Sequence, residues 1–206
     1  MEVRTAKGAR EVQAHVDGRT ARSDRTRDAI VAAMLDLYEE GDVKPNAQRI
    51  AARAGVSERT IFQHFHDREA LFAAVADRQW ERVSALADVI SPDLPLPERI
   101  DAFLRARVRQ LEVMTPVRRA AILTEPFSGT VAAQLRASRD HGRRQVEDVF
   151  ANELSGCAGP EDRAQLLAGL ASATSWNTWE SLRDHQGLSK IEAREVMRRM
   201  IAALLS

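Results

Sequence analysis

The sequence has little of several features that would point to other classes of protein. Its single cysteine, Cys157, cannot form an intrachain disulfide and has no His or Cys nearby at metal-ligand spacing. No run approaches the roughly 18 apolar residues of a membrane helix, and the amino-terminal residues lack the apolar core of a signal peptide. We therefore expect a cytoplasmic protein with no membrane segment, metal or cofactor. A redox role for Cys157 stays open if its thiol is exposed and acidic.

An excess of charge of either sign is also absent. The chain has 30 Lys and Arg residues against 30 Asp and Glu residues, so its formal net charge is zero. Between residues 25 and 75 the acids slightly outnumber the bases. This balance excludes a protein that holds polyanions by bulk charge alone. A phosphate-binding surface would have to rely on a few well-placed cations and on helix N-termini, with a modest salt dependence.

The residues that are present predict an all-α protein. The chain has 206 residues, 44% of them hydrophobic, which is enough for one or two domains with a real core. Apolar residues recur at helical spacing in about nine segments, and no segment has the alternation typical of a strand. We expect a flexible basic arm over residues 1–22, a small helical domain over 23–72 and a larger helical domain over 73–206. A continuous helix over 68–90 is expected to bridge the two domains. In the larger domain we expect Pro116 to end a helix, one helix to run over residues 160–186, and Ser189 to start the last helix as part of a capping box.

The most informative segment is residues 46–65, where two short helical patterns meet at a turn that contains a glycine. Asn46 is a good N-cap for the first helix, in which Ile50, Ala51 and Ala54 form the apolar stripe. Gly55 stands where the chain needs a positive φ, and Ser57 caps the second helix. This is the pattern of a helix-turn-helix.

The second of these helices has a polar outer face. Ile61 and Phe65 are four residues apart and predict the buried side, which leaves Arg59, Thr60, Gln63 and His64 outward. Hydroxyl, amide, imidazole and guanidinium groups on one helical face are able to contact bases and phosphates in a DNA major groove. We expect double-stranded DNA to be contacted by Asn46, Gln48, Ser57, Arg59, Thr60, Gln63, His64 and Arg68.

Residues 27–72 resemble the DNA-binding domain of the tetracycline-repressor (TetR) family. The matching positions are Ile30, Ala33, Gly41, Ile50, Ala51, Ala54 to Ser57, Thr60, His64, Phe65, Arg68, Glu69 and Leu71. Two positions depart from the family pattern. Phe62 replaces the usual tyrosine and lacks its phosphate-binding hydroxyl, whereas Arg68 replaces the usual lysine and keeps the charge.

The resemblance implies a homodimeric transcription regulator, most simply a repressor that leaves a palindromic operator when an unknown small molecule binds. It implies that the last two helices form the dimer interface, for which we expect Gly169, Ala173, Trp176, Trp179, Val196 and Met200. The alternative is that the two tryptophans fill the core of the single chain. The amino-terminal arm has two interpretations as well, a solvated tail or a contact to the DNA minor groove.

The resemblance also implies a ligand cavity in the larger domain. We expect its lining among Trp80, Val83, Phe103, Leu104, Arg107, Leu111, Phe127, Leu170 and Thr174. Arg107 is the distinctive residue because it lies on or beside an apolar stripe, and a buried arginine needs an anionic or carbonyl partner. An acidic residue, exposure to solvent or an acidic ligand would each account for it.

No arrangement of residues indicates catalysis. Ser57 is explained as a helix cap, and the chain shows neither a glycine-rich phosphate loop nor paired catalytic carboxylates. We therefore expect a regulator and no enzyme. Two alternatives remain open: an activator or partner-controlled regulator without an inducer, and a helical ligand-binding or enzymatic protein that keeps the amino-terminal domain for packing only.

Overall fold

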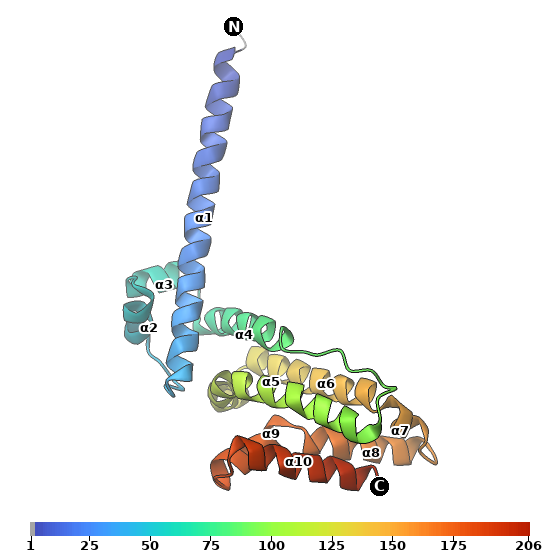
Figure 1. The fold of residues 1–206 in the computed structure, drawn as a ribbon. Coiled ribbons are helices and arrows are strands. Elements are labelled where there is room, and N and C mark those ends of the chain that lie inside the picture. The colour runs from blue at the N-terminus through green and yellow to red at the C-terminus, as the bar shows by residue number, and fades with distance from the viewer. Residues whose placement is uncertain (1–2) are drawn as a thin grey trace. The chain divides into compact units, whose positions relative to one another are not determined.

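The computed structural model describes the backbone of residues 3–206 and the side chains of residues 20–206, and this described part contains no strand. The all-α prediction with about nine helices is confirmed. In chain order the elements are α1 (Val3–Glu39), α2 (Ala47–Ala54), α3 (Glu58–His64), α4 (Arg68–Ser84), α5 (Leu96–Thr124), the 3₁₀ turn η1 (Glu125–Phe127), α6 (Gly129–Val149), α7 (Ala151–Ser155), α8 (Pro160–Ala173), α9 (Trp176–Glu180), the π-helical turn η2 (Ser181–His185) and α10 (Lys190–Leu204) (Figure 1).

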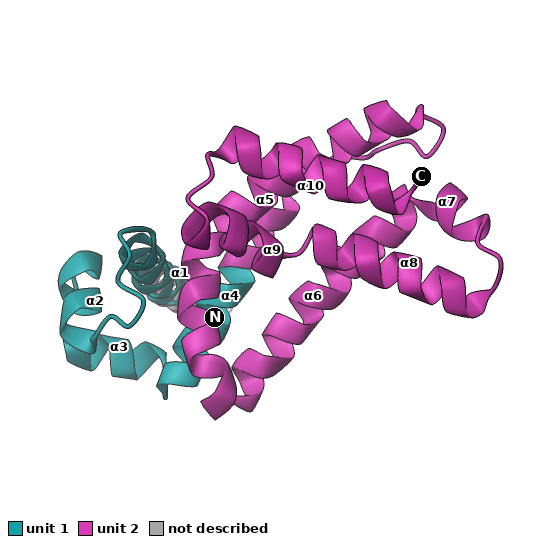
Figure 2. Cartoon of the chain, turned by 90° about the horizontal axis from the view of Figure 1, so that it is seen from below, with its two compact units in different colours: residues 1–78 teal, residues 79–206 magenta. Residues whose placement is uncertain are grey.

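The chain forms two compact units, residues 1–78 and residues 79–206 (Figure 2). The boundary falls inside α4. We call the first the N-terminal unit and the second the C-terminal unit, and each is described by itself. None of the described helices is both long enough and apolar enough to span a bilayer.

Helix α1 begins earlier than the sequence predicted. It starts at Val3, whereas the prediction placed its first residue at Ser23. No proline occurs between these positions, and Ala, Arg and Glu there favour a helix, so nothing in the local sequence stops it. Side chains before Thr20 lie outside the described residues, so the mobility of the predicted arm and its contact to DNA stay predictions.

Two turns of the N-terminal unit contain a glycine with positive φ. Gly41, with φ of 90°, follows the end of α1, and Gly55, with φ of 67°, ends α2. These left-handed conformations favour glycine because it has no Cβ to clash. The core of the unit is formed by buried residues from all four of its helices, among them Ile30, Met34, Leu37, Tyr38, Ile50, Ala51, Ile61, Phe65, Leu71 and Val75.

Helix α4 is shorter than predicted, because it ends at Ser84 and not at Ile90. The chain then tightens into turns in which Leu86 N–H donates to the Val83 carbonyl over 3.1 Å. Contacts with α5 direct the following segment: Asp88 pairs with Arg109 at 2.7 Å, and the Pro92 carbonyl accepts from Arg99 Nη1 at 2.7 Å. These tertiary contacts override the helical pattern of residues 85–90.

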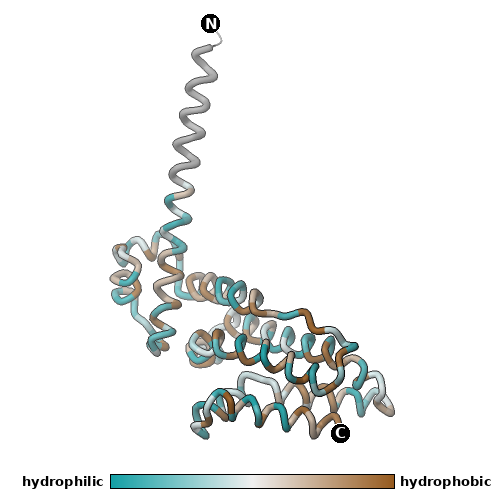
Figure 3. The backbone as a smooth tube through the Cα atoms, in the orientation of Figure 1, coloured by the Kyte–Doolittle hydropathy of each residue, from teal (hydrophilic) through white to brown (hydrophobic). Residues whose placement is uncertain are grey.

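The C-terminal unit is a helical bundle in which α5 contacts α6, α9 and α10, and α8 contacts α6 and α10. In Figure 3 hydrophobic and hydrophilic segments alternate along these helices, as expected for helices with one buried side. The buried sides meet in one core that includes Phe103, Leu104, Leu111, Phe150, Leu154, Leu170, Trp179, Met197 and Ile201.

Two further helix boundaries differ from the prediction. The sequence predicted a helix end at Pro116, but α5 continues through this proline to Thr124, with Val117, Ala120 and Ala121 buried. The predicted helix over residues 160–186 is instead broken after Ala173. There Ser175 starts α9 by accepting from Thr178 N–H at 3.2 Å, and Thr178 Oγ1 donates to the Ser172 carbonyl at 2.6 Å. Local side-chain bonds of this kind compete with helix continuation.

Candidate nucleic-acid interface and ligand cavity

Helix α3 presents the polar face that the sequence predicted. Ile61 and Phe65 are buried, at 4% and 1% exposed, while Arg59 and Gln63 are exposed and Thr60 and His64 are half-buried. The α3 side chains that are exposed therefore include a cation and an amide, and they extend from a helix whose inner side is fixed in the core. Such a surface is able to form hydrogen bonds with base edges and phosphates.

The two ends of α3 are held by specific hydrogen bonds. At its start, Ser57 Oγ accepts from Thr60 N–H at 3.1 Å and lies 2.8 Å from Thr60 Oγ1. At its end, Arg27 from α1 donates to the His64 carbonyl at 3.1 Å, and its guanidinium lies 4.2 Å from the Phe65 ring centroid. Helix α3 is thereby fixed in position, which a reading surface requires.

Several acidic residues of the N-terminal unit form ion pairs within it. Arg53 pairs with Glu40 at 2.8 Å, Arg49 with Asp42 at 2.7 Å and Arg78 with Asp28 at 2.7 Å. The Arg53 hydrogen bond holds the pKa of Glu40 below its usual value. Among the described residues, the exposed Arg59 and Arg68 take part in no ion pair. The neutral net charge is therefore compatible with a phosphate-binding surface built from these two cations.

The C-terminal unit contains a cavity of about 390 Å³ between α5, α6 and the α8–α9 junction. Its lining is Arg107, Leu111, Met114, Arg118, Ser138, Arg139, Asp140, Gly142, Arg143, Ala168, Ala171, Ser172, Thr174, Ser175, Trp176 and Asn177. This volume falls within the range of sites for small molecules. A second hollow of about 240 Å³ lies beside Phe103 and Arg107.

Comparison with known proteins decides the family. Residues 30–75 match the family model described as "Bacterial regulatory proteins, tetR family". Over 159 residues, 72% of this chain, the sequence is 30% identical to the HTH-type transcriptional repressor Rv1474c of Mycobacterium tuberculosis, and the match covers 83% of that repressor. The chain belongs to the TetR family. It is a transcriptional regulator by this membership.

Solved TetR-family structures have the same fold at lower identity. A tetR-family transcriptional regulator from Streptomyces coelicolor superposes with a TM-score of 0.69 at 19% identity, covering 88% of this chain and 80% of that one. NalD, the secondary repressor of the MexAB-OprM multidrug efflux pump in Pseudomonas aeruginosa, gives a TM-score of 0.52 at 22% identity, covering 88% and 96%. At these identities the likeness concerns the fold alone.

Within this TetR-family chain, the expected DNA contacts lie on neighbouring elements of the helix-turn-helix. Arg59, Gln63, Gln48 and Arg68 are exposed, on α3, α2 and the start of α4. Asn46 and Ser57 are also exposed, but their side-chain oxygens accept from the N–H groups of Arg49 and Thr60 as helix caps. Asn46 and Ser57 are thus needed to position α2 and α3.

The expected ligand-pocket residues of the TetR-family chain are divided between several places. Arg107, Leu111 and Thr174 line the larger cavity, and Phe103 lines the smaller hollow. Leu104, Leu170 and Val83 are buried and line neither space. Trp80 is 42% exposed with its ring against His141, and Phe127 is 87% exposed. The sequence prediction omitted Arg118, which lies eleven residues or three turns after Arg107, because the helix was expected to end at Pro116 between them.

The expected dimer residues are likewise divided. Ala173, Trp176 and Trp179 are covered within the single chain, which is the alternative that the sequence had left open for the tryptophans. Gly169 packs closely against α10, since a Cβ there would lie 3.1 Å from Leu204 Cδ2. Val196 is half-buried and Met200 is 39% exposed. The dimer interface of this TetR-family regulator stays a prediction, and Val196 and Met200 are the members with free surface.

The surroundings of Cys157 bear on the redox role that the sequence left open. The thiol is half-buried, and desolvation together with the carboxylate of Asp162 raises its pKa. Redox-sensing cysteines are exposed and have a lowered pKa. The surroundings of Cys157 therefore do not favour a redox role.

Phe62 stands where the TetR family usually has a tyrosine, and this difference can be tested. Its ring is 63% exposed, so a hydroxyl added to it would reach solvent or a DNA phosphate. We expect Phe62→Tyr to tighten DNA binding about threefold to tenfold, because one hydrogen bond to a charged group contributes about 1.5 kcal/mol or less at an exposed site. Electrophoretic mobility shifts on one DNA fragment measure this. Equal DNA affinity of the unchanged protein and Phe62→Tyr would show that residue 62 does not face the DNA phosphate backbone.

Proposed function

We propose that this TetR-family regulator is a cytoplasmic repressor that binds an inverted-repeat operator as a homodimer and is released by a small-molecule effector. The observation that carries the proposal is the fixed α3 helix, with exposed Arg59 and Gln63 and with both ends anchored. The relative Rv1474c is described as a transcriptional repressor, which supports the direction of control.

The proposed homodimer would account for an operator with two-fold symmetry. Two copies related by a two-fold axis place two α3 helices in successive major grooves, with half-sites about 34–36 Å apart or a multiple of one turn. The exposed apolar residues on α10, Met200 and Leu204 at 39% and 41%, together with half-buried Val196, support an interface at this helix. A single copy would have too few base contacts for a specific site.

Effector release requires a ligand that favours the arrangement of the chain that does not bind DNA. A coupling of about 1–3 kcal/mol between the two sites changes operator affinity by about 5-fold to 150-fold. The cavity of about 390 Å³ supports such a site in the C-terminal unit. Helix α4 contains the boundary between the two units and is therefore the covalent link through which they communicate.

The first experiment is selection of bound sequences from a random DNA pool by the purified full chain, with its oligomeric mass measured in parallel. We expect enrichment of a palindrome by a dimer. A folded dimer that enriches no sequence would contradict the proposal and direct attention to a ligand-binding or enzymatic role for the C-terminal unit.

The predicted reading residues are tested on the selected operator. We expect Thr60→Ala and His64→Ala each to weaken binding about tenfold, or about 1.4 kcal/mol, because each removes a polar group from the reading face. Fluorescence anisotropy with labelled operator measures the affinity. His185→Ala, which changes an exposed histidine of the C-terminal unit, is the control. Unchanged affinity in both α3 variants would contradict the assigned surface.

A further inference from the structure

One face of α5 forms a wall of the larger cavity with an unusual composition. Arg107, Leu111, Met114 and Arg118 follow at spacings of four, three and four residues, so they share one side of the helix. The two arginines lie about 16 Å apart along the helix axis at the level of their Cα atoms. Between them the wall is apolar. This wall of the cavity therefore has a cation at each end and hydrophobic side chains between them, while the opposite lining includes polar residues such as Ser138, Ser172 and Asn177.

Arg107 is buried and has no acidic partner among the residues that the structure describes. It is 5% exposed, its Nη2 donates to the Gly142 carbonyl at 3.1 Å, and its guanidinium lies 5.0 Å from the Phe103 ring centroid. Its Nε has no hydrogen-bond partner within the described residues. Burial lowers the pKa of Arg107 to about 10. In the described part of the chain, its charge is thus compensated by one carbonyl and one ring.

Arg118 is in a similar situation. It is 8% exposed and lies 5.9 Å from the Trp176 ring centroid, and its buried Nε is unpartnered in the part of the chain that the structure describes. Burial, and next the charge of Arg139, lower its pKa to about 10. Glu125 opposes this effect, but its carboxylate is already paired with Arg139 at 3.0 Å.

The contrast with Arg99 shows what the cavity lacks. Arg99 is equally buried and its Nε is likewise unpartnered within the described residues, but its Nη atoms form an ion pair with Glu153 and donate to the Pro92 carbonyl. Around the cavity, Arg139 and Arg143 add positive charge, and Asp140 is the single acid in its lining. Buried charges in proteins are normally paired, because an unpaired one loses its hydration without compensation. An anion in this cavity would supply the missing partner.

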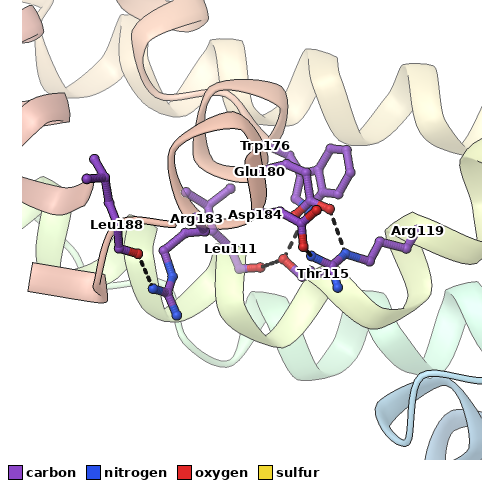
Figure 4. A network of polar contacts seen from close by, with 8 residues as sticks. All are labelled: Leu111, Thr115, Arg119, Trp176, Glu180, Arg183, Asp184 and Leu188. Atoms are coloured by element: carbon purple, nitrogen blue, oxygen red, sulfur yellow. Dashed lines mark hydrogen bonds and ion pairs between the residues drawn. The ribbon is translucent and has the colours of Figure 1, made fainter. Parts of the chain in front are cut away.

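We propose that the cavity binds a small organic anion, whose carboxylate or phosphate oxygens accept from the Arg107 and Arg118 guanidinium groups and whose apolar part packs on Leu111, Met114 and Trp176. Guanidinium groups bind both kinds of oxyanion in two-pronged fashion. The Trp176 ring is held in place for this contact, since its Nε1 donates to Thr115 Oγ1 at 3.0 Å, and Arg119 binds Glu180 and Asp184 on the following turns (Figure 4). As an effector site, this inference rests on the proposed function.

The test uses the full chain without DNA. The probes are straight-chain dicarboxylates from glutarate to sebacate, phenyl phosphate and inorganic phosphate, and each dicarboxylate is paired with its neutral diamide. We expect at least one acid to raise the Tm by about 5–10 °C at a hundredfold excess over its Kd, and to change the tryptophan fluorescence of the chain saturably, while its diamide does neither. The carboxylate and phosphate arms distinguish the two kinds of anion.

Variants connect the binding to the two arginines. We expect Arg107→Met and Arg118→Met each to weaken binding of that acid at least tenfold without lowering the Tm of the free protein, because each removes an uncompensated buried charge. Arg136→Met, which changes an exposed arginine of α6 outside the lining, should leave binding unchanged. Arg→Lys at either position should give intermediate affinity, since the charge remains and the two-pronged contact is lost.

Three outcomes would decide whether the cavity binds an anion and whether that anion is an effector. The proposal is overturned if no dicarboxylate stabilises the protein more than its diamide does and neither phosphate stabilises it at all, or if both Arg→Met variants bind the stabilising anion normally. An acid that binds through both arginines but leaves the selected operator occupied supports the anion site and contradicts effector release. Because binding is measured without DNA, failure of operator selection and failure of anion binding are recognised separately.

Discussion

Replacing Phe65 by alanine is expected to unfold the helix-turn-helix region and abolish operator binding. Phe65 is 1% exposed at the end of α3, and its ring lies under the Arg27 guanidinium. Removing a buried phenylalanine ring costs about 3–5 kcal/mol through lost burial and the cavity left behind. That is a large part of the stability of a small domain. Loss of the ring also removes the surface on which Arg27 holds the end of α3.

Hydrogen exchange of peptides from residues 26–75 measures this effect, which we expect as exchange at least a hundredfold faster than in the unchanged protein. The matched control is Phe62→Ala, which removes the same kind of ring three residues earlier, within α3, at a position that is 63% exposed. Phe62→Ala should leave exchange nearly unchanged. All three tryptophans lie in the C-terminal unit, so their fluorescence checks that this unit is folded in both variants. Equal protection in the two variants would contradict the assigned core.

Replacing Arg99 by methionine is expected to destabilise the C-terminal unit by about 3 kcal/mol or more. Arg99 is 3% exposed at the start of α5 and connects three segments through the Pro92 carbonyl, the Glu153 carboxylate of α7 and the Phe150 ring. Removing one member of a buried ion pair leaves the other charge uncompensated, at a cost of about 3–5 kcal/mol. Glu153 is partly exposed, so the lower end of this range applies.

Urea unfolding followed by tryptophan fluorescence gives the free energy for this unit. The comparison is Arg163→Met, because Arg163 and Glu147 form an exposed pair in the same unit, whose loss should cost less than about 1 kcal/mol. The double variant Arg99→Met with Glu153→Leu removes both charges and should recover much of the loss. If the double variant is no more stable than Arg99→Met alone, the unpaired carboxylate is not the cause.

The features that the sequence predicted well are fixed by neighbouring residues. Asn46, Ser57 and Ser189 each cap a helix through their own side chain, and Gly55 adopts the positive φ expected between α2 and α3. Caps and turns depend on a few consecutive positions, so they can be read directly from the sequence. The helix-turn-helix and the family could be predicted for this reason.

The features that the sequence did not predict depend on contacts between distant segments. The segment after α4 contacts α5, for example through the Asp88–Arg109 pair, and no local breaker marks the end of α4 at Ser84. Arg107 and Arg118 line the same cavity only because α5 continues through Pro116, and the sequence did not predict this. Burial of Trp176 and Trp179 within one chain also depends on which helices pack together. A periodic pattern shows that a face is apolar, but it does not show what covers it.

Pro116 gives α5 a mechanical property that its neighbours lack. Proline has no N–H, so the Glu112 carbonyl lacks its usual helical donor, and the ring crowds the preceding turn. Bending at this point therefore meets less resistance than elsewhere along the helix. Because Arg107 and Arg118 lie on opposite sides of Pro116, a hinge motion of α5 would alter the distance between their guanidinium groups. A rigid molecule that spans both groups would lock the hinge at one angle, whereas one of another length would select a different angle.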